Sequence, residues 1–208
     1  MALKQTKLAS DILDIFNSMK DNYKKEGYDG DKEFCEGLGK AFKDFGESGQ
    51  ITTVDAGTVS AGAFTGSGSG SLTLSSSDTI STLKNAVKAM KEDKKDDDYL
   101  AEQITQSLHD MYDAQDIVST KVNGSIVPPT GSAITISGAS GKGTIKCAFD
   151  TVESGLKSFF ALMKNQDKDD SDLANEIASL VYASIKSGIV STKDEGEIEG
   201  ALGSGTIS

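Results

Sequence analysis

The chain has 208 residues, of which 37% are hydrophobic and 25% are charged, and its formal net charge is −11. The sequence contains no arginine, and the acidic balance disfavours nucleic-acid binding, which needs a basic patch for the phosphates. No apolar run reaches the roughly 18 residues of a membrane helix, and the N-terminus lacks the apolar core of a signal peptide. We therefore expect a folded protein made in the cytoplasm, with neither a nucleic-acid nor a membrane partner.

The first predicted elements are two amphipathic helices. Their apolar residues recur at i, i+4 and i+7 in the first helix and at i, i+4 and i+8 in the second, which places each set on one helix face. These residues are Ile12, Phe16 and Met19, then Phe34, Leu38 and Phe42. Lys20 follows Met19, where a cation is favoured by the helix dipole.

Two strands are predicted after the helices. The first runs from Ile51 to Val59, and the second ends in Gly68-Ser69-Gly70-Ser71-Leu72. In later copies of the strand, such as Val118 to Ile126, apolar residues and threonine alternate with polar residues, as in a half-buried strand.

This series of elements occurs three times in the chain. The helix residues are matched by Leu83, Val87 and Met90 with Leu100, Ile104 and Leu108, and by Leu156, Phe160 and Met163 with Leu173, Ile177 and Val181. The first strand is matched by Val118 to Ile126 and Val190 to Ile198, and the Gly-x-Gly motif by residues 141–145 and 203–207. A fixed period marks a repeated structural unit.

The predicted fold is therefore α+β, with three tandem repeats of helix–helix–β-hairpin at residues 1–77, 78–149 and 150–208. Units of this size bury only about 60% of their unfolded surface, so neighbouring repeats or subunits should share a core. The three hairpins could share one sheet within the chain or complete sheets between subunits. Both alternatives stay open. The sequence also does not decide whether the three repeats form one pseudo-threefold body or an extended row.

The connections between the strands differ most between copies, and such loops commonly carry partner contacts in repeat proteins. The second copy inserts a Pro-Pro segment, and the glycines permit close approach of another chain. Exposed strand edges also invite strand addition from a neighbour. The candidate partner-contact residues are Thr53, Gly57, Val59, Thr120, Gly124, Ile126, Pro128, Pro129, Thr192, Gly196, Ile198 and Ile207.

Acidic residues precede the second helix of every repeat, at residues 29–31, 96–98 and 169–172. Helix N-capping is the favoured interpretation, and a calcium site stays open as the alternative, although the loops lack the Asp-x-Asp-x-Asp-Gly pattern with a terminal Glu that is typical of calcium sites. Cys35 and Cys147 occupy non-equivalent positions, and we expect half-buried thiols with no disulfide.

No catalytic, cofactor-binding or metal-binding residue is predicted. His109 has no nucleophile motif near it. Gly66-Ser67-Gly68-Ser69-Gly70 has the letters of a nucleophile elbow, but it lies before a strand. Residues 138–144 lack the phosphate-loop pattern, because Gly143 follows Lys142. An enzyme is not expected.

The repeated Leu-x-x-x-Ile helix, Ile-Val-Ser-Thr-Lys-Val-x-Gly-x-Ile, the Pro-Pro insertion and the terminal Gly-x-Gly-x-Ile together resemble small virion structural proteins of tailed bacteriophages. The resemblance implies a component of the tail, neck or capsid surface, with other virion proteins and further copies of itself as partners. It brings no active site and no cofactor. The alternative function is a calcium-stabilised, adhesin-like surface module that uses the acidic loops.

Overall fold

Each repeat folds into two antiparallel helices followed by a β-hairpin, as the sequence predicts. The computed structural model describes residues 2–208. The first repeat contains α1 (Gln5–Asn22), α2 (Gly30–Glu47), β1 (Ile51–Val59) and β2 (Gly62–Leu72). The second contains α3 (Ser77–Glu92), α4 (Asp97–Tyr112), β3 (Val118–Val127) and β4 (Ile134–Lys146). The third contains α5 (Asp150–Asn165), α6 (Asp170–Lys186), β5 (Ile189–Asp194), a short 3₁₀ helix (Gly196–Ile198) and β6 (Leu202–Ile207).

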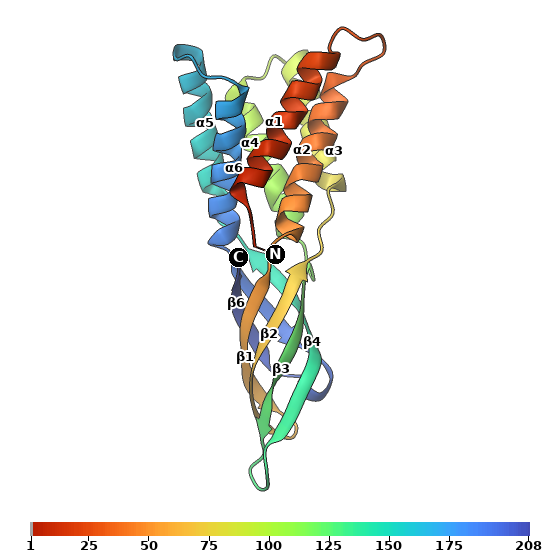
Figure 1. The fold of residues 1–208 in the computed structure, drawn as a ribbon, viewed down its shortest axis with the longest axis vertical. Coiled ribbons are helices and arrows are strands. Elements are labelled where there is room, and N and C mark those ends of the chain that lie inside the picture. The colour runs from red at the N-terminus through yellow and green to blue at the C-terminus, as the bar shows by residue number, and fades with distance from the viewer. Residues whose placement is uncertain (1) are drawn as a thin grey trace.

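The three hairpins form one closed antiparallel barrel, in the strand order β1-β2-β3-β4-β5-β6. Closure comes from β1 and β6, which pair from Ile51 with Ile207 to Ala56 with Leu202. The helices lie together at one end of this barrel, and the long axis of the molecule runs through both parts (Figure 1). The hairpins therefore share one sheet within the chain. Because closure leaves no unpaired edge along the paired segments, the predicted strand addition from a neighbour has no edge to use there.

The third copy departs from the predicted strand. Residues 190–198 were expected to match the other two copies, but β5 ends at Asp194 and the chain turns at Gly196, whose φ is +75°. Strands β5 and β6 are both shorter than the strands of the other two hairpins, and residues 195–201, which include the 3₁₀ helix, connect them. Ile198 nevertheless stays fully buried and packs with Val59 and Ile126, its counterparts in the other copies.

The six helices form a ring. Helices contact each other within each repeat, and α2 contacts α3, α4 contacts α5 and α6 contacts α1 between repeats. Along the predicted apolar faces, Ile12, Leu83 and Leu156 are buried, while Met19, Met90 and Met163 are all half-buried. The equivalent residues therefore have matching exposure in the three copies, as expected of a pseudo-threefold body.

Three equivalent ion pairs connect the helices at the end of the ring away from the barrel. Each lysine that follows a methionine near a helix C-terminus pairs with an aspartate in the first turn of the neighbouring helix. The pairs are Lys20–Asp170 at 2.7 Å, Lys164–Asp97 at 3.0 Å, and Lys91–Asp31. Such exposed pairs add little stability, but their recurrence shows that the repeats meet in the same way.

Candidate functional site: the barrel tip and the barrel interior

Most of the predicted partner-contact residues lie inside the barrel. The side chains of Thr53, Val59, Thr120, Ile126, Thr192, Ile198 and Ile207 are each at most 5% exposed. A partner of the folded protein would not reach these side chains. The predicted alternation of the strands is confirmed, but their apolar face points into the closed barrel and not toward another protein.

The glycines of the first strands do permit close backbone approach, but to segments of the same chain. A Cβ on Gly57 would lie 2.7 Å from the Cα of Ala201, and one on Gly124 would collide with the carbonyl oxygen of Thr65. Gly196 lies in the turn after β5 and has open space around it. The expectation that Gly57 and Gly124 admit another chain is therefore replaced by packing within the barrel.

The two prolines lie on the surface at the barrel tip, which we define as residues 127–134. This segment joins β3 to β4 and projects farthest from the helices (Figure 1). Pro129 is exposed and Pro128 half-buried, and they are flanked by Val127 and Ile134, which are 57% and 46% exposed. The tip is therefore apolar and accessible.

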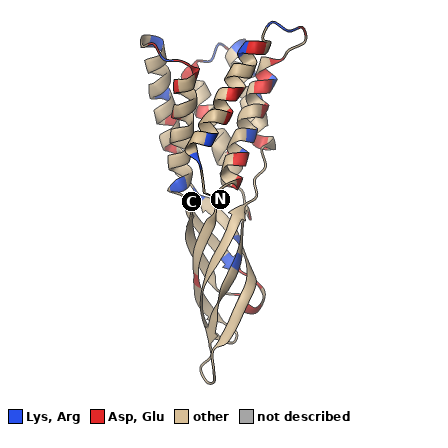
Figure 2. Cartoon of the chain, viewed as in Figure 1, with Lys and Arg blue, Asp and Glu red and all other residues tan. Residues whose placement is uncertain are grey.

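Charge is distributed unevenly between the two parts of the molecule. Acidic and basic residues are distributed along the helices, while the strands contain few of them (Figure 2). Strands β2 and β6 contain no charged residue at all. The outer surface of the barrel is thus built largely from serine, threonine and glycine.

Inside the barrel, a polar belt separates two apolar clusters. We define the belt as the buried polar residues Thr53, Asp55, Thr120, Thr192 and Asp194. On the helix side of the belt, Ile51, Leu72, Val118, Ile145, Val190 and Ile207 belong to the main core. On the tip side, Val59, Phe64, Val122, Ile126, Ile136, Ile198 and Ala201 form a second core.

The Gly-x-Gly motifs make room for this belt. Each belt threonine lies between two glycines of the adjacent strands: Thr53 is opposite Gly68 and Gly205, Thr120 opposite Gly70 and Gly141, and Thr192 opposite Gly143 and Gly203. A Cβ on Gly203 would collide with both Oδ1 of Asp55 and Oγ1 of Thr192. A Cβ on Gly141 would lie 2.5 Å from Oγ1 of Thr120 and 2.7 Å from Oδ1 of Asp194.

The carboxylates of the belt break its threefold symmetry. Asp55, Val122 and Asp194 occupy equivalent positions, so two repeats supply an acid and the third an apolar side chain. Asp55 accepts hydrogen bonds from Oγ1 of Thr53, at 2.9 Å to Oδ2 and 3.2 Å to Oδ1. Within residues 2–208, neither carboxylate oxygen of Asp194 nor Oγ1 of Thr192 has a hydrogen-bond partner.

Burial raises the pKa of Asp194 from 3.8 to about 6, and the nearby Asp55 carboxylate adds to this rise. Both effects disfavour the charged form. Sequence reasoning missed Asp55 and Asp194. The signal was present, because Asp55 follows Ile51 and Thr53 at the inward positions of an alternating strand.

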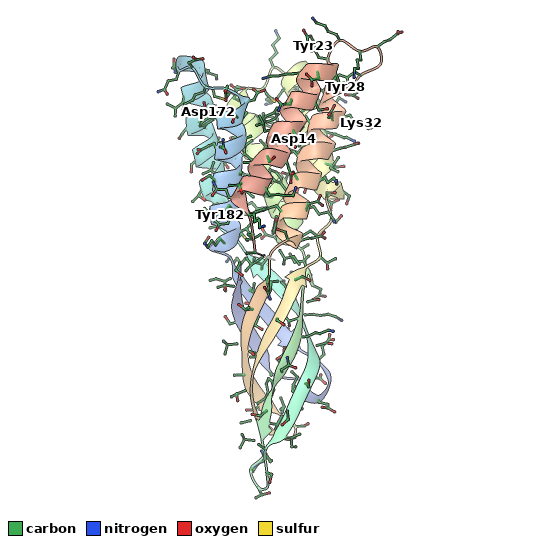
Figure 3. The ribbon with its side chains drawn as sticks, viewed as in Figure 1. Asp14, Tyr23, Tyr28, Lys32, Asp172 and Tyr182 are labelled. Atoms are coloured by element: carbon green, nitrogen blue, oxygen red, sulfur yellow. The ribbon has the colours of Figure 1, made fainter. Side chains whose placement is uncertain are left out.

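The acidic loops have the predicted capping role. Asp29, Asp96 and Asp169 each accept a backbone hydrogen bond from the residue three positions later, at 3.0, 3.1 and 3.0 Å. Figure 3 shows Asp172, which completes a capping box with Asp169, at the α6 end away from the barrel. In the described part of the chain, no group of three or more acidic, histidine or cysteine side chains is arranged to hold a metal ion.

The remaining reactive side chains have structural surroundings. Nδ1 of His109 lies 2.8 Å from Oδ2 of Asp113, and its ring packs edge-on against Phe149 at 5.3 Å. Cys35 and Cys147 are free and buried, deeper than the half-buried thiols expected from the sequence. Burial raises the pKa of Cys35 to about 11 and that of Cys147 to about 12, so both thiols are held in their unreactive protonated form at neutral pH.

Comparison with known proteins found no similar protein. No protein-family model, curated protein or solved structure matches the chain. Across residues 2–208, the helices are too short or too polar for any of them to cross a membrane.

Proposed function

We propose that this chain is a non-enzymatic structural protein of a tailed-bacteriophage virion, part of the tail, neck or capsid surface, that acts through protein–protein contacts. The single observation that supports contact by the barrel is the accessible apolar tip. Exposed apolar side chains gathered at one place mark interaction sites more often than scattered ones do.

The arrangement of the tip favours a protein partner. Val127 and Ile134 stand at the ends of β3 and β4 and Pro128 and Pro129 lie between them, so the contact surface is carried on a rigid barrel. A rigid support lowers the entropy that is lost on binding. The barrel wall carries few charges (Figure 2), and its own exposed apolar residues, which include Val54 on β1 and Leu202 on β6, lie outside the tip segment.

The opposite end of the molecule offers a second surface, which suits a component with neighbours on two sides. Tyr23 and Tyr28 lie at the end of the helices away from the barrel (Figure 3), and Tyr23 is 66% exposed. The calcium-dependent surface module is the alternative function. The loops on which it depends are occupied with helix capping and ion pairs, which makes it the weaker proposal.

The test is incorporation into particles. Phage particles from the source culture would be purified on a density gradient and analysed by quantitative mass spectrometry, with complementation by variant chains. We expect the wild type in a fixed copy number per particle, and we expect Val127→Ser with Ile134→Ser to lower incorporation. Ile189→Ser is the matched control, because Ile189 is 61% exposed at the other end of the barrel.

Two results would contradict this proposal. If the wild-type chain is missing from purified particles, the virion assignment is wrong. If the tip variant is incorporated as well as Ile189→Ser, the tip is not the contact surface. Self-association stays a separate prediction, to be measured by sedimentation velocity over a range of protein concentrations.

A further inference from the structure

The polar belt inside the barrel contains two carboxyl groups with no side-chain cation beside them among residues 2–208. Asp55 is fully buried and Asp194 is 3% exposed. The lysines of the neighbouring strands, Lys121, Lys142 and Lys193, are all exposed on the outer surface. A buried charge without a partner is strongly destabilising, so the ionised belt would need a positive charge that no side chain of the barrel supplies.

The polar side-chain atoms of this belt are all oxygens. They comprise the carboxylates of Asp55 and Asp194 and the hydroxyl groups of three threonines, two of which are engaged: Thr53 donates to Asp55 and Thr120 to the carbonyl oxygen of Gly141 at 3.4 Å. The unpartnered atoms are both carboxylate oxygens of Asp194 and Oγ1 of Thr192. This set lacks the nitrogen and sulfur ligands that zinc and copper prefer, and it suits a hard cation.

The glycines bring these oxygens together. Oδ1 of Asp55 and Oγ1 of Thr192 both approach Gly203, because a Cβ on that residue would collide with both. Asp194 is two residues beyond Thr192 on β5, and its Oδ1 lies above Gly141 on the adjacent strand. Asp55 is also close enough to Asp194 for its charge to raise the pKa of that carboxyl group, so two carboxylates and a hydroxyl from β1 and β5 lie in one region of the barrel interior.

We propose that this belt binds one calcium ion through the carboxylates of Asp55 and Asp194 and the hydroxyl group of Thr192. Two carboxylates balance the charge of a divalent ion, and calcium accepts irregular arrangements of oxygen ligands, whereas magnesium demands a near-ideal octahedron. The site is distinct from the acidic loops, whose aspartates cap helices. Water supplies the remaining ligands.

The position of the belt predicts how the ion exchanges. Apolar clusters close the barrel on both sides of the belt, so the ion enters when the barrel forms and leaves when it opens. Binding is then coupled to folding, as in other buried metal sites. A chelator added to the folded protein should remove the ion slowly, and a chelator added to the unfolded chain should remove it at once.

The experiment measures metal content and thermal unfolding of the full chain. Protein purified with calcium would be dialysed against a chelator, either folded or unfolded in guanidinium, then refolded and analysed by elemental mass spectrometry. We expect one calcium per chain before unfolding and none after unfolding with chelator. The midpoint of the refolded protein should rise with the logarithm of added calcium, and magnesium at equal concentration should leave it unchanged.

The variants Asp55→Asn and Asp194→Asn should lose both the bound calcium and the calcium-dependent rise in midpoint. Asp98→Asn is the matched control, since Asp98 is an exposed acid of the second loop, and it should behave as the wild type. Native protein without stoichiometric calcium, together with a midpoint that does not respond to calcium, would overturn the proposal and leave a protonated carboxylate pair. A calcium response lost in Asp98→Asn but kept in Asp194→Asn would overturn it in favour of the loops. Should a belt variant fail to fold, the metal content and calcium response of the wild type decide the question.

Discussion

Oγ1 of Thr53 donates a hydrogen bond of 2.9 Å to Oδ2 of Asp55, two residues further along β1, inside the closed barrel. The equivalent hydroxyl of Thr120 faces Val122 in place of an acid and makes a longer contact of 3.4 Å with the carbonyl oxygen of Gly141. The same threonine position therefore has different hydrogen-bonding partners in the repeats.

This difference predicts unequal effects of one substitution. Thr53→Val keeps the side-chain shape but removes the donor to a buried carboxylate, and it should lower the free energy of unfolding by about 1–3 kcal/mol. Thr120→Val is the control and should cost less than about 1 kcal/mol. Urea unfolding of both variants checks this, and equal losses would mean that the Thr53–Asp55 bond contributes nothing of its own.

The glycines opposite the belt threonines should not tolerate substitution by a larger residue. A Cβ on Gly143 would collide with the carbonyl oxygen of Ser191 and lie 2.8 Å from the Cα of Thr192. Because backbone atoms cannot move aside as a side chain can, Gly143→Ala should destabilise the protein by about 1–3 kcal/mol or more, or prevent folding. Ser140→Ala, on the exposed face of the same strand, should change stability by less than about 0.5 kcal/mol. Circular dichroism melts would show this, and a wild-type melt for Gly143→Ala would disprove the tight strand packing.

The helices and the strand alternation could be predicted because their signals are local. Ile12, Phe16 and Met19 define a helix face by spacing alone, and the inward positions of β3 follow from alternation. Barrel closure could not be predicted in this way, because it depends on pairing between Ile51 and Ile207, which are far apart in the sequence. No residue in or near β1 or β6 indicates that these two strands pair with each other.

The candidate site was only partly predictable for the same reason. The alternation of β1 predicts one apolar face, but it does not show whether that face packs inside a closed barrel or against another subunit. Thr53 and Val59 were therefore predicted to contact a partner. β5 ends early because the chain turns at Gly196, although residues 190–198 keep the spacing of the other copies. Asp194 becomes a buried acid only once the barrel closes around it.

Contacts between repeats should be measurable through Tyr112. This fully buried residue of α4 donates a hydrogen bond of 3.0 Å to the carbonyl oxygen of Phe42 in α2, and so connects the second repeat to the first. Tyr112→Phe removes this buried hydrogen bond, while the Phe42 carbonyl keeps its place in the hydrogen-bond ladder of α2, and it should cost about 0.5–1.5 kcal/mol in guanidinium unfolding. Tyr182→Phe is the matched control, because the Tyr182 hydroxyl only accepts a 2.9 Å hydrogen bond from the exposed Lys186, and its effect should stay within about 0.5 kcal/mol. A cost for Tyr112→Phe no larger than that of the control would show that the bond does not join the repeats.

The buried carboxylate of Asp194 should give the metal-free protein a characteristic pH dependence. Its pKa is 3.8 as an ordinary side chain and about 6 in the folded protein, so the folded state binds the proton more tightly than the unfolded chain does. Stability from this group is therefore greatest below pH 4, falls as the pH rises to about 6 and is constant above that. Other carboxylates oppose this trend, so the measured quantity is the difference in free energy of unfolding between Asp194→Asn and wild type, both in chelator. That difference should grow in favour of the variant by on the order of 2 kcal/mol between pH 4 and pH 7, and a difference that is constant across this range would show that Asp194 has the same pKa in both states.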